Sequence, residues 1–154
     1  MTTPLIRMLV ETHGYPEVDA GTVDDFLAAH EHAVLFFAGD AERLVESNDV
    51  AVILPELVKA LDGRLVPALV AKEAERDLQL RYRFNKFPTL VLCRHGAYLG
   101  TIAGVQDWQD YLRDISALLN GPVSEPPSFE FPDGCYTAGM QRAPQAQPST
   151  GEAS

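Results

Sequence analysis

The segment that most constrains this fold is an uninterrupted apolar run, Ala33 to Ala38, with the sequence AVLFFA. A strand in which no polar residue alternates with the apolar ones has no face to turn toward water, so it is typical of a central strand buried on both sides. A helical pattern lies on either side of it in the sequence, one starting at Thr22 as N-cap and one near Asn48. We therefore predict an α/β protein whose central sheet is covered by helices on both faces.

Two prolines mark special positions in the first half of the chain. The helix that starts near Asn48 contains Pro55, which lacks a backbone donor, so we expect a kink there. Asp62 and Gly63 end that helix, and the strand that follows, Arg64 to Ala71, contains Pro67. A proline within a strand indicates an edge position or an irregularity.

The second half alternates in the same way and ends in an amphipathic helix. The predicted elements are a helix from Glu73 to Phe84, a strand from Pro88 to Cys93, a turn at His95-Gly96, a strand from Ala97 to Ala103 and a helix from Asp107 to Asn120. The apolar residues of the last helix recur at helical spacing and are predicted to face the core; they are Trp108, Tyr111, Leu112, Ile115 and Leu119.

The composition changes after the last helix. Six of the eleven prolines follow Asn120, and the apolar periodicity stops. We expect one domain at residues 1–120, an extended segment at residues 121–140 and a disordered tail at residues 141–154. Two aromatic residues at spacing two lie in the sequence Ser128 to Pro132, so this part of the segment is expected to dock on the domain as a strand.

The charge of the chain narrows the classes of partner. Asp and Glu number 22 against 12 Lys and Arg, a formal net charge of −10. Such a surface repels phosphate backbones and anionic lipid heads, so we expect neither nucleic acid binding nor membrane insertion, and no run of 18 apolar residues is present. The acidity indicates either a basic peptide or protein partner or simply a soluble surface.

Cysteine and histidine usage gives no sign of a cofactor or metal site. Cys93 and Cys135 are far apart and belong to no motif, and the histidines lack the paired spacing of a zinc site. Two isolated cysteines without an export signal favour a reducing cytoplasm. Cys93 lies within an apolar strand and is expected to pack as a small hydrophobic residue, and a thiol-disulfide enzyme using Cys93 is the alternative.

The order of these elements resembles thioredoxin over residues 1–120. In that family a proline kinks the helix five residues after the second active-site cysteine, and Pro55 matches that proline. Counting back places Ser47 and Val50 at the two cysteine positions. Ser47 is expected to act as a helix cap there, and Pro88 matches the proline that follows a cis peptide bond beside the active site. The resemblance implies a three-layer thioredoxin-like fold with a mixed sheet and without the redox pair.

A narrower resemblance is carried by four stretches of sequence, which are Val34 to Asp40, Val50 to Leu57, Phe87 to Leu90, and Gly96 to Ile102 leading to Asp107-Trp108. They are similar to the hydrogenase-expression proteins of nickel–iron hydrogenase operons, the HyaE, HupG and HoxO group. The resemblance implies a chaperone without redox activity or cofactor. Its implied partners are the hydrogenase small subunit, met through its twin-arginine signal peptide before export, and other hydrogenase-maturation proteins.

A binding site for such a peptide is expected on the face around Pro88. Phe87, Pro88 and Thr89 would contact the apolar stretch, and carboxylates before the kinked helix would meet the two arginines. These carboxylates are Asp40, Glu42, Glu46 and Asp49. The alternatives are that the carboxylates only cap the helix in a solvated loop, and that the protein is an assembly subunit docking a folded partner.

Overall fold

The computed structural model describes residues 3–41 and 43–126. The helices are α1 (Pro4–Glu11), α2 (Val23–Ala28), α3 (Val45–Ala60), the 3-10 turn η1 (Lys72–Ala74), α4 (Glu75–Tyr82) and α5 (Trp108–Asn120). The strands are β1 (Glu17–Val18), β2 (His32–Phe37), β3 (Val66–Val70), β4 (Thr89–Arg94) and β5 (Ala97–Ala103).

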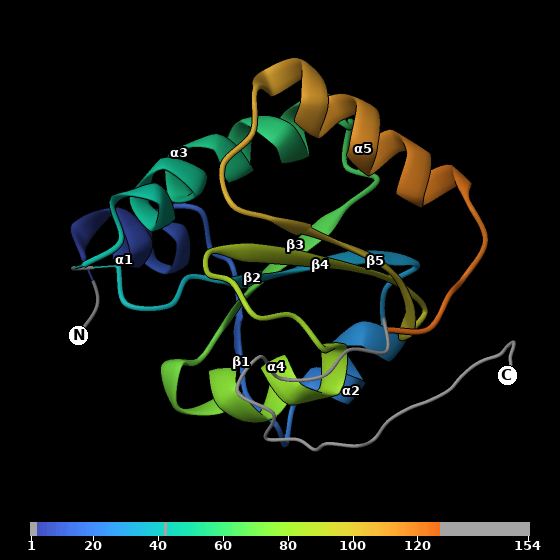
Figure 1. The fold of residues 1–154 in the computed structure, drawn as a ribbon, viewed down its shortest axis with the longest axis horizontal. Coiled ribbons are helices and arrows are strands. Elements are labelled where there is room, and N and C mark those ends of the chain that lie inside the picture. Colours follow the sequence, from blue (N-terminus) through green and yellow to red (C-terminus); the bar gives the residue numbers. More distant parts are fainter. Residues whose placement is uncertain (1–2, 42, 127–154) are drawn as a thin grey trace, which may run out of the picture.

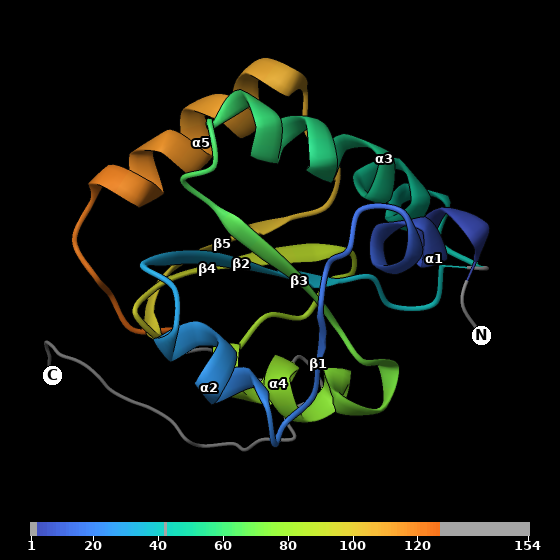
Figure 2. The ribbon, with the colours of Figure 1, turned by 180° about the vertical axis from the view of Figure 1, so that it is seen from behind.

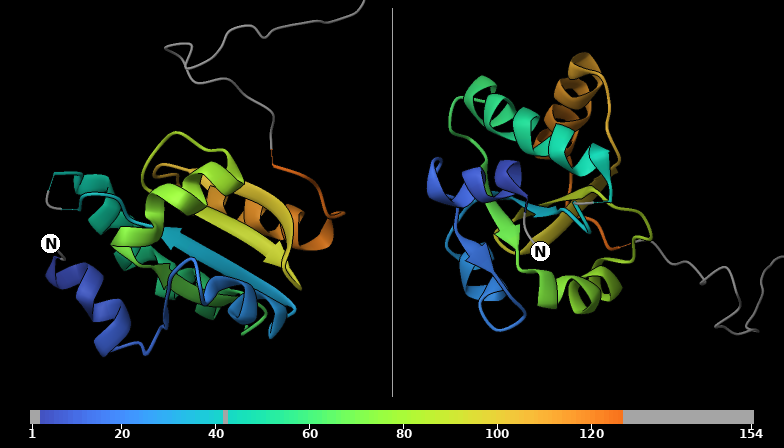
Figure 3. Two further views of the ribbon diagram at one scale, coloured as in Figure 1. Left: turned by 90° about the horizontal axis from the view of Figure 1, so that it is seen from below. Right: turned by 90° about the vertical axis from the view of Figure 1, so that its left-hand side faces the viewer.

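The strands form one mixed sheet in the order β1-β3-β2-β4-β5. The first three run parallel to one another, and β4 and β5 are antiparallel to their neighbours. Helices α1, α3 and α5 cover one face of this sheet and α2 and α4 cover the other (Figures 1 and 2). The predicted α/β fold with a mixed sheet and helices on both faces is confirmed, and the three layers are seen from two further directions in Figure 3.

The centre of the sheet is β2, as its apolar sequence predicts. Its residues from Ala33 to Phe37 are at most 1% exposed. Val34 and Phe36 pack on the side of α1, α3 and α5, while Leu35 and Phe37 pack on the side of α2 and α4. Alternate side chains of one strand therefore hold together two separate layers of core.

Pro67 is not on an edge strand, because β3 lies between β1 and β2. The N–H groups of Leu69 and Ala71 point toward β1, where they donate to the carbonyls of Pro16 and Val18. Strand alternation turns the nitrogen of Pro67 to the same side. β1 pairs only with Leu69 and Val70, so no residue of β1 lies opposite Pro67. The missing N–H group of this proline therefore leaves no strand carbonyl without a donor.

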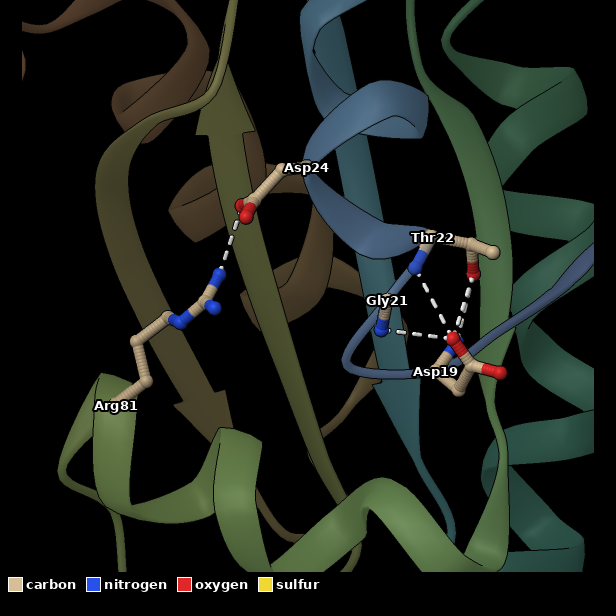
Figure 4. A network of polar contacts seen from close by, with 5 residues as sticks. All are labelled: Asp19, Gly21, Thr22, Asp24 and Arg81. Atoms are coloured by element: carbon tan, nitrogen blue, oxygen red, sulfur yellow. Dashed lines mark hydrogen bonds and ion pairs between the residues drawn. The ribbon is translucent and has the colours of Figure 1, made fainter.

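The entry to α2 differs from the predicted cap. Thr22 occupies the cap position, but its hydroxyl donates to Asp19 Oδ1 at 3.2 Å instead of capping the helix. The same carboxylate oxygen accepts from the N–H groups of Gly21 at 2.8 Å and Thr22 at 3.0 Å (Figure 4). Asp24 lies on the first turn of α2, and its Oδ1 accepts a hydrogen bond from Nη1 of Arg81 in α4 at 2.8 Å. This ion pair links the two helices of this layer.

Trp108 was predicted to be buried and is 40% exposed, so that prediction is wrong. It is the first residue of α5 and lies beyond the part of the helix that covers the sheet. Tyr111, less than one turn later, is fully buried and its hydroxyl donates to the carbonyl of Gly104 at 3.0 Å. The helical spacing of apolar residues in α5 thus begins at Trp108, one apolar position before the first residue that is buried in the core.

The chain after α5 returns along the outer edge of the sheet. Arg94 donates to the carbonyls of Leu119 at 2.7 Å and Gly121 at 2.8 Å, and Ser124 N–H donates to the Tyr98 carbonyl at 2.8 Å. The expected docking of Ser128 to Pro132, most of the segment 121–140, and the tail 141–154 lie outside the described residues.

We predict that Gly100→Ala lowers the stability of the fold. A Cβ atom at Gly100 would lie 2.5 Å from Cδ2 of Leu118, so α5 or the leucine must shift. We expect a loss of about 1–3 kcal/mol in the free energy of unfolding, measured by urea denaturation. Gly21→Ala is the matched control, because its Cβ would meet Asp19 at an ordinary 3.4 Å. Equal stability of the two variants would contradict the close packing of α5 on β5.

Candidate functional site

The candidate site lies where β2 ends and β4 begins. Because the two strands are antiparallel and Phe37 is paired with Thr89, the segment after β2 and the segment before β4 meet at one end of the sheet. The first segment leads through Gly39 into α3, and the second contains Phe87 and Pro88. The structure thus brings together the region of the expected cysteine positions and the expected peptide-binding loop.

The peptide bond between Phe87 and Pro88 is cis, as predicted. Pro88 is buried, and its carbonyl accepts from Gly104 N–H at 2.8 Å, which ties the loop to the end of β5. The hydroxyl of Thr89 donates to the carbonyl of Lys86, and Thr89 is only 1% exposed. A bound peptide would therefore reach the side chain of Phe87, which is half-buried, rather than those of Pro88 and Thr89.

The backbone of Phe87 is the most telling feature of this loop. Within residues 3–41 and 43–126, neither its N–H nor its carbonyl has a hydrogen-bond partner. Buried or half-buried backbone groups are nearly always paired with protein or water. Phe87 thus has a backbone donor and acceptor that are unpaired within the described residues, and an added strand would pair with such groups.

Ser47 and Val50 occupy the first turns of α3 and are buried, at 0% and 1% exposure. The prediction that Ser47 caps the helix is wrong, because α3 begins at Val45 and the Ser47 hydroxyl donates to the carbonyl of Ala38. Val50 packs in the core beside Leu54. Both positions therefore contribute packing and a backbone contact and carry no thiol.

Cys93 lies in β4 on the side of α2 and α4 and has no exposed surface. Burial raises the pKa of its thiol to about 11, and the pKa of the neighbouring Tyr82 is raised to about 12, also chiefly by burial. A neutral, inaccessible thiol is a poor nucleophile. This agrees with the expectation that Cys93 packs as a small hydrophobic residue.

The expected acidic cluster is divided by the fold. Asp40 is half-buried in the loop before α3, next to the segment that holds Phe87, and Glu42 lies outside the described residues. Glu46 and Asp49 are exposed on α3. Their negative charge adds to the effect of burial in raising the pKa of Tyr111.

Exposed apolar side chains gather near this end of the molecule. Leu44 and Val45 stand at the start of α3, and Val45 is 75% exposed. Val105 is exposed in the loop after β5 and Trp108 at the first position of α5, and Gly104 of that loop donates to the carbonyl of Pro88. Trp108, which was predicted to lie in the core, is therefore an exposed apolar side chain at this end of the molecule.

Glu75 is a site residue that the sequence reasoning missed. It is the first residue of α4, is only 8% exposed, and its carboxylate accepts from the N–H of Gly39 at 2.9 Å. Lys72 donates to the carbonyl of the same Gly39 at 3.2 Å. Burial raises the pKa of Glu75, although the N–H of Gly39 and the charge of Lys72 act in the opposite direction.

Gly39, which contacts Glu75, also packs closely against Phe87 of the Phe87-Pro88 loop. Its φ of +69° is in the left-handed region, and a Cβ there would lie 2.7 Å from Cβ of Phe87. Only glycine fits such a position without strain. Gly39 and Glu75 also line a pocket of about 480 Å³, together with Asp40, Arg43, Leu44 and Phe87.

Comparison with known proteins places the chain in a family. The profile of the family described as "Hydrogenase-1 expression protein HyaE" matches residues 5–111. The hydrogenase expression/formation protein HoxO of Azotobacter vinelandii is 47% identical over 127 residues, which are 82% of this chain and 85% of the relative. This protein belongs to the HyaE family of hydrogenase expression proteins.

Other relatives agree with this assignment. HoxO of Cupriavidus necator is 41% identical over 131 residues, covering 84% of this chain and 81% of the relative. A mutant thioredoxin of Halobacterium salinarum is 21% identical, and the match covers 71% of this chain and 93% of the thioredoxin, with a TM-score of 0.56. This likeness supports the thioredoxin-like fold alone.

The rest of the described molecule shows no metal or membrane feature. In residues 3–41 and 43–126, no three His, Cys, Asp or Glu side chains lie together as a metal would require. None of the helices described there is long and apolar enough to cross a membrane.

We predict that Cys93 does not react with thiol reagents in the folded protein. A Cys135→Ser variant leaves Cys93 as the single thiol, and its labelling is followed by absorbance at about pH 8, far below the raised pKa of about 11. The same variant unfolded in about 6 M guanidinium should label at once. Rapid labelling of the folded variant would contradict the burial of Cys93.

We also predict that Glu75 makes stability fall as pH rises. Its folded pKa is raised above the ordinary 4.5, so the folded state binds the proton more strongly and gains stability that is present below that value. This gain is lost as the pH rises through the folded pKa. The stability of wild type minus that of Glu75→Gln should therefore decrease between about pH 4 and about pH 8, measured by urea denaturation.

Glu73→Gln is the control for that experiment, because Glu73 is exposed two residues away. Its difference from wild type should stay level over the same pH range. If the stability difference between wild type and Glu75→Gln also stayed constant over this pH range, burial of the Glu75 carboxylate would have no net cost.

Proposed function

We propose that this protein is a redox-inactive, thioredoxin-like chaperone of nickel–iron hydrogenase maturation. In this proposal it binds the hydrogenase small subunit in the cytoplasm, through the twin-arginine signal peptide, before export. The family membership supports the hydrogenase role. Ser47 and Val50 at the cysteine positions, together with the buried thiol of Cys93, favour a binding protein over an enzyme.

The observation that carries the proposal is the backbone of Phe87 beside the cis proline, which has no hydrogen-bond partner in the described part of the chain. An extended peptide would donate to the Phe87 carbonyl and accept from its N–H, as in other cases of strand addition. Such bonds depend on the peptide backbone and suit a partner that is read in extended form. A signal peptide held before export meets this condition.

The side chains around Phe87 match the composition of such a peptide. The apolar stretch would contact Leu44, Val45, Val105 and Trp108, all exposed at this end of the molecule. The arginines would meet the carboxylates before and within α3. Each exposed ion pair contributes about 1 kcal/mol or less, so the complex should be modest in affinity and sensitive to salt, which suits a chaperone that must release its client.

Docking of a folded partner is the second candidate, because exposed apolar side chains such as Val45 and Trp108 also suit a folded surface. Other hydrogenase-maturation proteins are then the partners of the same face. Strand addition at Phe87 separates the two candidates, because only an extended segment uses its available backbone groups. Calorimetry with the isolated signal peptide tests this directly.

We predict that replacing Asp40, Glu42, Glu46 and Asp49 by Asn or Gln weakens binding of the signal peptide. The loss should be about tenfold at low salt, since several weak charge contacts are removed together. It should shrink as salt is added, because screening already removes much of the attraction in the wild type. Isothermal titration calorimetry at two salt concentrations measures both effects.

The control replaces four exposed acids elsewhere on the surface, which are Asp25, Glu31, Asp62 and Asp77. It changes the net charge by the same amount, so equal weakening by both sets would mean that diffuse charge attracts the peptide. A peptide in which Lys-Lys replaces Arg-Arg tests whether the arginines themselves are read. If wild type does not bind the peptide at all, the proposed client site is wrong.

A further inference from the structure

The carboxylate of Glu75 is buried and forms no ion pair within the described residues, although the charge of Lys72 acts on it. It is 8% exposed, and no Lys, Arg or His among residues 3–41 and 43–126 comes within ion-pair distance of it. Lys72, on the turn before α4, donates to the carbonyl of Gly39. Glutamate is almost never buried unless it is paired, so a buried glutamate without an ion pair needs a reason.

Besides the backbone N–H groups of Ala38 and Gly39, the carboxylate of Glu75 borders a pocket. Its volume is about 480 Å³, and Glu75 lies in its wall together with Asp40, Leu44 and Phe87. Phe84 packs edge-to-face against the ring of Phe87, with 5.6 Å between the two ring centroids, and so helps to fix that ring. The pocket therefore combines two carboxylates with a fixed aromatic ring and an aliphatic side chain.

These groups match a guanidinium better than an ammonium. Arginine is planar, donates several hydrogen bonds in fixed directions and stacks on aromatic faces, and it is less strongly hydrated than lysine. A charge-assisted bond to a buried carboxylate is also stronger than one to an exposed carboxylate, because the surroundings screen it less. We propose that this pocket binds the side chain of one client arginine, with Glu75 as its buried acceptor.

This inference rests on the proposed function for the identity of the client, but the pocket is testable without it. Glu75 would then determine specificity for arginine, whereas Glu46 and Asp49 on α3 act through their charge alone. Arg43 lines the same pocket and is exposed, so its positive charge opposes an entering guanidinium.

The first experiment uses a small probe. N-acetyl-L-arginine N-methylamide is titrated into the full-length protein while the amide signals are followed by NMR, with the lysine equivalent as control. We expect the arginine probe to shift the Gly39 amide, whose N–H contacts Glu75, and the lysine probe to shift it far less. The shift should be lost in Glu75→Gln and kept in Glu73→Gln.

The second experiment uses the signal peptide. Glu75→Gln should weaken its binding about tenfold, which corresponds to about 1.4 kcal/mol, while Glu73→Gln stays within about twofold of wild type. Arg43→Ala should strengthen binding. Because glutamine can still accept from Gly39 N–H, the loop is expected to keep its place, and an unshifted Gly39 amide in the free variant verifies this. If that amide moves, Asp40→Asn replaces Glu75→Gln as the deciding variant.

The outcomes separate the two proposals. If the peptide binds wild type and Glu75→Gln equally well, the arginine pocket is wrong and the proposed function stands. If the peptide does not bind but the arginine probe shifts Gly39, the pocket stands and the client is another arginine-containing segment. If the probe shifts nothing and Glu75→Gln binds the peptide as wild type does, Glu75 only holds the loop.

Discussion

The structure depends on the burial of β2 from both sides. The side chains of Val34 and Phe36 belong to one core layer and those of Leu35 and Phe37 to the other, so this central strand contributes to both layers, as its neighbours β3 and β4 also do. The same strand delivers its end, Ala38 and Gly39, to the candidate site. Any shift of β2 would therefore move the Glu75 contact and the loop against which Phe87 packs.

Local chemistry explains which parts of the fold could be predicted from the sequence. The turn at His95-Gly96 and the helix end at Asp62-Gly63 both adopt positive φ angles, which short polar residues and glycine favour. Trp108, Pro67 and Thr22 were predicted less well, because their environments depend on where other elements lie. Pro67 is tolerated inside the sheet only because β1 is two residues long.

The candidate site was predictable to the extent that it lies in continuous motifs. Phe87-Pro88 has a sequence signature, and the cis bond is present. Glu75 has almost none, since a glutamate at the start of a helix is ordinarily an exposed residue that favours the helix dipole. The only sign is its position directly after Ala74, at the border of the buried stripe that continues with Leu78. Its role depends on Gly39, which is 36 residues away in the chain.

In the proposed pocket, the buried carboxylate of Glu75 lowers the stability of the free protein and is available to bind a cation. The charged carboxylate is disfavoured in the free protein, as its raised pKa indicates, and the N–H bond from Gly39 does not offset the loss of water. A cation entering the pocket would recover part of that cost, so part of the binding free energy is prepared in the fold before the client arrives. Ser47 and Val50 show the opposite arrangement, because they are fully buried and satisfied within the protein. Ser47 and Val50, which the resemblance to thioredoxin assigns to the cysteine positions, are thus structural, whereas in our proposal the Phe87 backbone and the Glu75 carboxylate at the same end of the sheet bind the partner.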